Sequence, residues 1–535
     1  MAARPLALSL LLVGAALTLP ASGAGPAGAA PAPGGACPTP APLSFAPPTY
    51  VDTKRAGGEP LVATLPNGRL LYSAHAGTTH FFTPQAPNPG TGAFVENYQG
   101  QTYIWTSDDN GKSWKFRPRL IAPNGAPASG FSDPEVAIDS AGTVYYSEIN
   151  LANVAVSSSK DKGSTYNLEN FFGAILTDRQ WMEADRPGEL YFVANAFGGG
   201  TGVPPNPGAG AYISKSTDGG KTFTTNVPST KGGGGLGDIR VDKRSGTVYQ
   251  AHYSREGVLT VGALRSARRG DLTSVDLGVV AEDVQMLAHW PTFDLDPSGN
   301  LYITWDEDGT GDRPAGIYLS TSKDAARTWS QPVRVNTGSN TAIWPWLGVG
   351  DNGRVGIAWL EADRALPKHD AETSGEHGWR IRAAVTVTGL GCSTSKIPAF
   401  SLATATKEPV HRGTICQGGT TCQAFAIDRR LGDYFSVDVD GTGRLYAGYS
   451  DTRVAGAVSL PGFVRQSGGP SLLVPKRAGS TPTATTGRPA PAVEAAGGAL
   501  PVTGADTQLP LAAALLAMGA ALLVRARRQL GRVAA

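Results

Sequence analysis

A hairpin built around a glycine recurs along the chain roughly every fifty residues, and this repeat limits the fold more than any other feature of the sequence. Each copy has an apolar strand, a turn rich in Asp, Asn or Ser, and a second strand that carries a tyrosine in six of the seven copies. Polar side chains cap such turns, and glycine adopts the positive φ that other residues resist. The turn glycines are Gly68, Gly142, Gly188, Gly246, Gly299, Gly353 and Gly443.

The spacing of these turns indicates a radial array of small sheets. From Gly142 to Gly353 the intervals are 46, 58, 53 and 54 residues, which suits four short strands with their connections. We therefore predict an all-β fold, a β-propeller of four-stranded blades over residues 45–465, with disordered termini. Seven hairpins favour seven blades, and six is the alternative. The last repeat runs out of strands, so we expect the segment near Tyr50 to complete the final blade beside residues 445–450.

A second motif, S-x-D-x-G-x-x-aromatic, falls inside the same repeats. It occurs at residues 107–114, 159–166 and 216–223, and again at 322–329 with Ala326 in place of glycine. These segments resemble the Asp-box, or BNR repeat, of the sialidase-type propellers. The resemblance implies that each box forms the turn between the third and fourth strands of a blade, with its Asp bonded to turn backbone and its aromatic side chain packed into the blade. It assigns structural roles to Asp108, Asp161, Asp218 and Asp324.

The topology of a propeller predicts where a site would lie. The glycine turns and the Asp-boxes share one face, here called the turn face, while loops that enter the first strand or leave the second share the other, the loop face. Acids, guanidinium groups and indoles gathered at the loop face would suit a sugar or polyanion. The alternative is that these side chains only tie the blades together. The predicted ligand-binding residues are Asp178, Arg179, Trp181, Asp238, Arg240, His289, Trp290, Arg313, Trp344, Trp346, Arg364, Asp433 and Arg453.

The resemblance to sialidases also implies a chemistry. That family uses three arginines to hold the substrate carboxylate, a Tyr nucleophile assisted by a Glu, and an Asp acid/base, with the first Arg in an R-I-P string before the first hairpin. Tyr434, Glu135 and Asp133 are the catalytic candidates. The R-I-P position, however, reads Glu59-Pro60, and a carboxylate there would repel sialic acid.

Three functions therefore stay open. The leading hypothesis is a sialidase-like propeller that binds glycan or protein ligands at a bacterial surface. The second is an exo-α-sialidase or another glycoside hydrolase, and the third is a scaffold or adhesin without a small-molecule site. The formal net charge is only +2, and no basic block outside the tail suggests a nucleic-acid partner.

Cysteines and acidic residues give two smaller predictions. Four cysteines in an exported chain favour disulfides, of which we prefer Cys416 with Cys422 and Cys37 with Cys392. No His or Cys spacing indicates a metal, and no cofactor is expected. The acidic run at 306–312 leaves calcium open.

Both ends of the chain carry sorting features. Residues 1–30 contain an apolar run behind Arg4 that ends in small residues, as in a secretory signal peptide. Residues 466–499 are rich in Pro, Ala and Thr and predict a disordered linker. Residues 500–535 combine an LPxTG pentapeptide, an apolar stretch at 509–524 and a basic tail.

This ordered triple resembles a sortase sorting signal. The resemblance implies transient retention in the membrane, cleavage between threonine and glycine by a sortase, and covalent transfer to the peptidoglycan of a Gram-positive cell wall. The residues of the cleavage motif are Leu500, Pro501, Thr503 and Gly504.

Overall fold

The computed structural model describes most of residues 36–474. The described ranges are 36–75, 102–117, 132–149, 154–172, 177–196, 211–224, 227–228, 234–254, 256–287, 289–309, 313–366, 377–416, 428–453 and 459–474. The predicted signal peptide, most of the linker, the sorting signal and Cys422 lie outside them. No helix within these ranges is long and apolar enough to cross a membrane.

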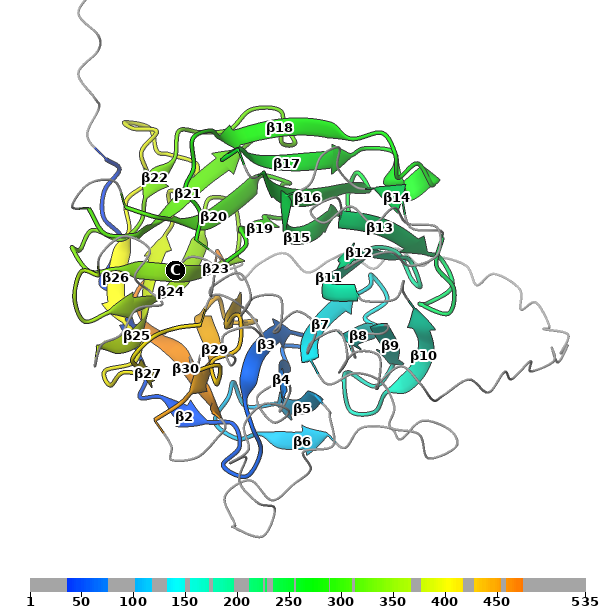
Figure 1. The fold of residues 1–535 in the computed structure, drawn as a ribbon, viewed down its shortest axis with the longest axis horizontal. Coiled ribbons are helices and arrows are strands. Elements are labelled where there is room, and N and C mark those ends of the chain that lie inside the picture. Colours follow the sequence, from blue (N-terminus) through cyan, green and yellow to red (C-terminus); the bar gives the residue numbers. More distant parts are fainter. Residues whose placement is uncertain are drawn as a thin grey trace, which may run out of the picture. The chain divides into compact units, whose positions relative to one another are not determined.

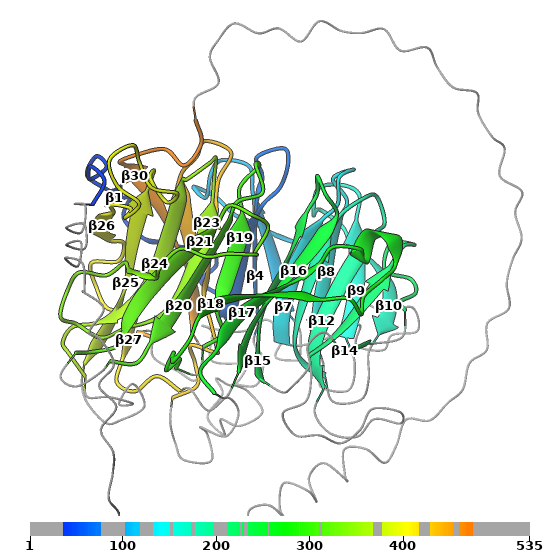
Figure 2. The same cartoon turned by 90° about the horizontal axis from the view of Figure 1, so that it is seen from above.

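Seven antiparallel sheets are arranged around a common axis, with the first strand of each sheet innermost (Figure 1). The predicted β-propeller is therefore confirmed, with seven blades rather than six. Figure 2 shows the same sheets from the side. Blades 1 to 3 are formed by β3 (Gly58–Thr64), β4 (Leu70–His75), β5 (Thr102–Ser107) and β6 (Lys115–Arg117); by β7 (Ser132–Ile138), β8 (Val144–Ile149), β9 (Val154–Ser159) and β10 (Asn167–Phe172); and by β11 (Thr177–Ala184), β12 (Leu190–Ala196), β13 (Ala211–Ser216) and β14 (Val227–Pro228).

The next three blades follow the same order. Blade 4 also carries the short 3-10 helix η2 (Ala267–Arg269) between its third and fourth strands. Blades 4 to 6 are formed by β15 (Gly234–Asp242), β16 (Thr247–Ser254), β17 (Leu259–Leu264) and β18 (Asp276–Ala281); by β19 (Thr292–Leu295), β20 (Leu301–Glu307), β21 (Gly316–Ser322) and β22 (Val333–Arg334); and by β23 (Ala342–Val349), β24 (Val355–Ala362), β25 (Gly378–Thr386), β26 (Ser401–Thr404) and β27 (His411–Arg412).

The seventh blade joins the two ends of the folded chain. Its strands β28 (Ser436–Val439), β29 (Leu445–Asp451) and β30 (Leu460–Gly468) are completed by β1 (Ser44–Phe45) and β2 (Thr49–Tyr50), which both pair with β30. The expected closure by the N-terminal segment is confirmed, although its partner is β30 rather than the strand at 445–450. Gln466 is buried within β30, so the folded body continues past residue 465.

A disulfide reinforces this closure. Cys37, just before β1, is bonded to Cys392 in the turn between β25 and β26, with the two Cα atoms 5.9 Å apart. The predicted pairing is confirmed, and it ties the N-terminal segment to blade 6 as well as to blade 7. Cys416 is also held in a disulfide, while its expected partner lies outside the described residues.

Neighbouring blades are joined at the turn face by a bond that the hairpin motif encodes. Asp296 caps its own turn through the N–H groups of Ser298 and Asn300 and accepts a hydrogen bond from the Tyr302 hydroxyl at 2.6 Å. That hydroxyl in turn accepts the Gly353 N–H of blade 6 at 2.8 Å. The tyrosine of the second strand therefore links one glycine turn to the next.

The Asp-boxes lie between third and fourth strands, as their resemblance implied. In the second box, Asp161 accepts the Thr165 N–H at 2.8 Å and the Thr165 hydroxyl at 2.7 Å. One assignment was wrong. In the first box this role belongs to Asp109, which accepts the Ser113 N–H at 2.9 Å, because Asp109 is the residue two positions after Ser107. Asp108 instead pairs with Arg69 at 2.6 Å.

Candidate functional site

Five of the seven innermost strands begin with a backbone irregularity. The register of β3, β7, β11, β15 and β23 with its neighbour shifts near the start of the strand. At four of these shifts a non-glycine residue has a left-handed φ, which L-residues adopt at a cost of about 1–2 kcal/mol each. These residues are Glu59 (46°), Asp133 (51°), Arg179 (48°) and Trp344 (58°).

Arg179 lies at the centre of a group of aromatic rings contributed by four blades. Its guanidinium carbon is 3.8 Å from the ring centre of Trp181, 4.7 Å from that of Trp290 and 4.6 Å from that of Tyr434. Trp346 lies 5.6 Å from Tyr434 and 5.9 Å from Trp181, centre to centre. Such cation–π contacts stabilise by about 2 kcal/mol or more when the cation is desolvated.

Two carboxylates complete this group. Asp133 Oδ2 and Glu135 Oε2 lie 4.0 and 3.8 Å from the Arg179 guanidinium nitrogens. Burial raises the pKa of Glu135 to about 7, against the opposing charge of Arg179. We call the seven residues Asp133, Glu135, Arg179, Trp181, Trp290, Trp346 and Tyr434 the Arg179 cluster. All three catalytic candidates and four of the thirteen ligand-binding candidates therefore converge.

Tyr434 is turned toward protein rather than toward solvent. Its ring is 1% exposed, and its hydroxyl donates to the Pro134 carbonyl at 3.3 Å. Burial raises the pKa of the phenol well above its usual value, although Arg179 opposes the shift. The phenol therefore ionises less readily than that of an exposed tyrosine.

Glu59 is engaged in a separate ion-pair network beside the cluster. Its Oε2 lies 2.7 Å from His75 Nε2, and its Oε1 accepts from Arg429 at 3.3 Å and from the Asp433 N–H at 2.8 Å. Burial alone would raise the pKa of Glu59, but His75, Arg429 and Arg179 hold it well below the usual range. Arg429 also pairs with Asp433 at 2.5 Å.

Six further predicted residues do not belong to the Arg179 cluster: Asp178, His289, Arg313, Trp344, Arg364 and Arg453. His289 stacks on Trp290 and Trp344 at 4.8 and 5.9 Å, and burial lowers its pKa to about 3. Arg364 and Arg453 pair with their neighbours Asp363 and Asp451, and Arg313 is exposed. Asp178 belongs to β11, but its side chain lies outside the described part of the chain. Within that part, no second arginine stacks over the ring of Tyr434.

Asp238 and Arg240 lie in a row of charged side chains along the central channel of the propeller. Glu135 belongs to the same row, and its other members, Glu183, Asp294 and Asp438, were not predicted from the sequence. The inner edge of each first strand has no strand partner, so its N–H groups need other acceptors. In five blades a carboxylate on that strand accepts the N–H of the next residue. These carboxylates are Glu135, Glu183, Asp238, Asp294 and Asp438, at 2.7–3.0 Å.

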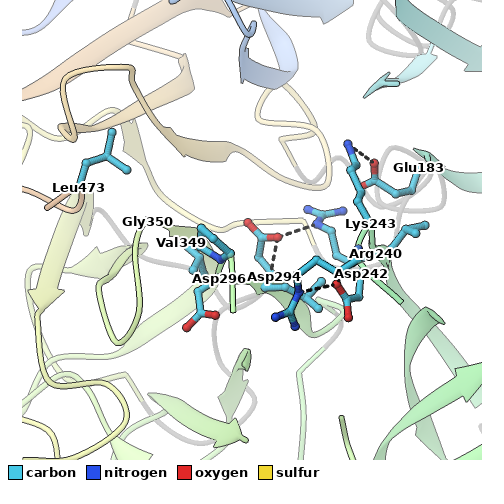
Figure 3. A pocket seen from close by; sticks show the side chains of 13 residues that line it. Glu183, Arg240, Asp242, Lys243, Asp294, Asp296, Val349, Gly350 and Leu473 are labelled. Atoms are coloured by element: carbon cyan, nitrogen blue, oxygen red, sulfur yellow. Dashed lines mark hydrogen bonds and ion pairs between the residues drawn. The ribbon is translucent and has the colours of Figure 1, made fainter. Parts of the chain in front are cut away.

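Two connected cavities lie along this row. One, of about 210 Å³, is lined by residues of all seven blades, and the other, of about 380 Å³, reaches the turns of blades 4 to 6 at the turn face. Glu183, Arg240, Lys243 and Asp294 border both. Figure 3 shows the larger cavity, where Lys243 points toward Glu183 and Arg240 toward Asp294. It lies opposite the predicted site.

The residues described here contain no group of three His, Cys, Asp or Glu arranged to hold a metal ion. Within the acidic run considered for calcium, Asp306 accepts the Trp344 N–H at 2.9 Å, and burial raises its pKa to about 7. Asp312 lies outside the described residues. Asp306 thus holds the strained backbone of Trp344 in place.

Comparisons with known proteins show similarity of the fold alone. No protein-family model matches the sequence, and no curated protein matches it. Among solved structures, a protein of unknown function from Dyadobacter fermentans is 14% identical over 79% of this chain and 98% of its own, with a TM-score of 0.41. An α-L-arabinofuranosidase of Fusarium graminearum is 14% identical over 80% and 98%, with a TM-score of 0.39.

An intramolecular trans-sialidase of Ruminococcus gnavus is 12% identical over 78% of this chain and 96% of its own, with a TM-score of 0.36. At these values the similarity is distant and carries no assignment of activity. The chain is thus a seven-bladed β-propeller with distant structural similarity to glycosidases and a trans-sialidase.

Proposed function

We propose that this chain is displayed on the cell wall of a Gram-positive bacterium, where the loop-face end of its propeller binds a glycan or protein ligand without hydrolysing it. The alternatives are an exo-α-sialidase or another glycoside hydrolase, and a scaffold or adhesin with no small-molecule site. Each makes a different prediction about the Arg179 cluster.

The left-handed backbone of Glu59, Asp133, Arg179 and Trp344 is the observation that carries the binding proposal. Strain of this kind persists only where the surroundings enforce it, and it gathers at ligand sites and active sites. The Asp-boxes also contain left-handed non-glycine residues, such as Lys162 and Ala325, but these lie in tight turns, whereas the four residues at the axis lie within strands. Four strained positions around one axis therefore favour a retained function over a bare scaffold.

Buried polar atoms without partners give the cluster further capacity for a ligand. The indole N–H groups of Trp181 and Trp290 and the Oε2 atom of Glu135 make no hydrogen bond with the described residues. Such groups are normally satisfied by protein, water or ligand. Trp290 is also partly exposed, so its ring offers a stacking surface of the kind that sugars use.

Two features disfavour the sialidase alternative. The position that the resemblance reserves for the first arginine is Glu59, which His75 and Arg429 already occupy. Tyr434 is buried and donates to a backbone carbonyl.

The proposal that the protein is displayed at the cell wall rests on sequence features at the two ends of the chain. The pentapeptide Leu500–Gly504, the apolar stretch and the basic tail stand in the order that a sortase substrate needs. A Cys37–Cys392 disulfide is consistent with an oxidising compartment. Replacing Thr503 by alanine should release the protein from the wall fraction into the membrane fraction and medium.

A glycan array on the purified chain tests the binding proposal. We expect specific signals that Trp290→Phe weakens at least tenfold. Trp329→Phe is the matched control, because Trp329 is equally half-buried but belongs to an Asp-box on the turn face. Absence of any glycan or cell-surface protein signal would favour the scaffold alternative, and an equal loss in both variants would remove the assignment to the Arg179 cluster.

A further inference from the structure

The channel described above contains more acids than bases. Six carboxylates line its two cavities, against three cations. The carboxylates are Glu135, Glu183, Asp242, Asp294, Asp296 and Asp438, and the cations are Arg240, Lys243 and Arg244. Arg244 pairs with Asp242 at 3.2 Å. Arg240 is committed to Asp238 at 2.5 Å and to Asp294 at 3.5 Å, and Lys243 donates to the Ile138 carbonyl at 2.8 Å and lies 3.9 Å from Glu183. The protein therefore leaves negative charge uncompensated inside a cavity, which favours a cationic occupant.

Two of these carboxylates are each fixed through one oxygen, whereas in Asp438 the second oxygen already accepts the Thr64 N–H at 2.6 Å. Glu183 Oε1 and Asp294 Oδ1 accept the N–H of the next residue at 2.9 and 2.8 Å. The hydrogen bonds and ion pairs that these two side chains make with the described residues are formed through Glu183 Oε1 and Asp294 Oδ1, which leaves the second oxygen of each for a ligand. Side chains held by backbone hydrogen bonds lose little further freedom when a ligand arrives.

A buried and unsatisfied oxygen supplies an observation independent of the acidic row. Glu135 is 5% exposed and lines the smaller cavity, and its Oε2 has no hydrogen-bond partner among the described residues. Its distance of 3.8 Å from Arg179 is too long for a hydrogen bond. A donor placed in the cavity would satisfy it.

We propose that this channel binds a small molecule through a primary ammonium group. An ammonium carries three donors on one nitrogen and suits single oxygens from separate strands, whereas a guanidinium prefers both oxygens of one carboxylate. The smaller cavity has the volume of about seven water molecules at ~30 Å³ each. That space fits a short aliphatic amine or a single amino sugar, and the ligand enters from the turn face.

The charge state of the site makes the binding depend on pH. Burial raises the pKa of Asp438 to about 6 and that of Glu135 to about 7, and it also raises the pKa of Asp294. These acids gain charge as the pH rises from 5 to 7.5, so amine affinity should rise over that range. The ionisable groups that line the two cavities are Glu135, Glu183, Arg240, Asp242, Lys243, Arg244, Asp294, Asp296 and Asp438, and Asp238 lies behind them in an ion pair with Arg240.

Calorimetric titration of the purified full chain with two amines and their neutral counterparts tests the proposal. Putrescine is compared with 1,4-butanediol, and glucosamine with N-acetylglucosamine. We expect one amine to bind with a Kd below about 1 mM, at least tenfold more tightly than its counterpart. The amine that binds shows whether the ligand is an aliphatic amine or an amino sugar. Equal affinity for charged and neutral partners, or no binding of either amine up to about 10 mM, would overturn the proposal.

Three variants locate the site. Glu183→Gln keeps the acceptor for the Ala184 N–H and removes the charge, and it should weaken amine binding at least tenfold. Asp294→Asn serves the same purpose if Glu183→Gln unfolds, which a thermal melt reveals. Glu282→Gln on the surface is the matched control and should change nothing. Unchanged binding in the folded channel variants would contradict the proposal.

The smaller cavity shares Glu135 and Trp346 with the Arg179 cluster, but the channel site and the loop-face site can be told apart by experiment. Trp290 does not line either cavity, so Trp290→Phe should leave amine binding unchanged even where it abolishes a glycan signal. Loss of amine binding in that variant would show that the ligand occupies the Arg179 cluster instead and would refute the channel site.

Discussion

Replacing Glu59 by glutamine removes one charge from a buried network without changing its shape. Glu59 is 1% exposed, and its partners His75 and Arg429 are 2% and 4% exposed. Glutamine retains the oxygen that accepts the Asp433 N–H at 2.8 Å. The variant therefore isolates the electrostatic contribution of the carboxylate, while the left-handed backbone at this position stays as strained as before.

The expected loss at pH 7 is about 3–5 kcal/mol, since removing one partner of a buried ion pair leaves the other charge uncompensated. An entropy of unfolding of ~2.1 cal/mol/K per residue, over roughly 440 residues, makes 1 kcal/mol equivalent to about 1 °C in Tm. Glu59→Gln should therefore lower Tm by about 3–5 °C. Glu282→Gln, on the surface, should lower it by less than about 1 °C.

The difference between wild type and variant should shrink in acid. The folded pKa of Glu59 is lowered, so its contribution is complete above the unfolded value of about 4.3 and is lost as the pH falls toward the folded value. At pH 3 about 1.8 kcal/mol of it is gone, at 1.36 kcal/mol per pH unit. Thermal melts followed by near-UV circular dichroism at pH 7 and pH 3 measure both quantities. Equal Tm values at pH 7, or a difference that grows in acid, would refute this reasoning.

Three further substitutions test the scaffold. Cys392→Ser should lower Tm by about 2–4 °C, which corresponds to the 2–4 kcal/mol typical of a disulfide. Because the bond to Cys37 is already absent in this variant, a reducing agent should not lower Tm further through that bond. Asp218→Ala should cost about 1–2 kcal/mol, because the carboxylate accepts turn N–H groups and a hydroxyl, whereas Asp276→Ala on an exposed edge should cost less than about 0.5 kcal/mol. Gly432→Ala should prevent accumulation of soluble protein, since its φ is +78° and a Cβ there would lie 2.1 Å from Glu59 Cγ.

The fold could be predicted from the sequence because its determinants are local. Each glycine turn needs only its own Asp and Gly, and each Asp-box only the eight residues that form it. Blade 6 was the exception. Like blades 4 and 7 it has no Asp-box, and its outer strands β25, β26 and β27 fall in a segment without clear repeat pattern. The turn between β25 and β26 instead carries the disulfide partner Cys392.

The site was predicted less completely because its contacts join distant parts of the chain. The hydrogen bond from Arg429 to Glu59 spans 370 residues, and nothing near Glu59 reveals that its charge is already compensated. A signal for the strained positions was nevertheless present. Glu59, Asp133 and Trp344 are each followed by proline, which marks three of the four positions in the sequence, although proline alone favours an extended conformation in the residue before it.

The channel acids also had a signal that the sequence analysis missed. Glu183, Asp294 and Asp438 share one place in the repeat, as a charged residue followed by an apolar residue and the Asp of the turn. Arg240 occupies the same place in blade 4. Comparing the charges at one position across all blades would have brought these residues together at one level of the channel.

Hydrolysis of a fluorogenic sialoside by the purified chain tests most directly the central claim that the Arg179 cluster recognises a ligand but does not turn it over. We predict no release of fluorophore above the buffer blank for either wild type or Tyr434→Phe. Hydrolysis by the wild type that Tyr434→Phe abolishes, in a variant with unchanged Tm, would contradict it.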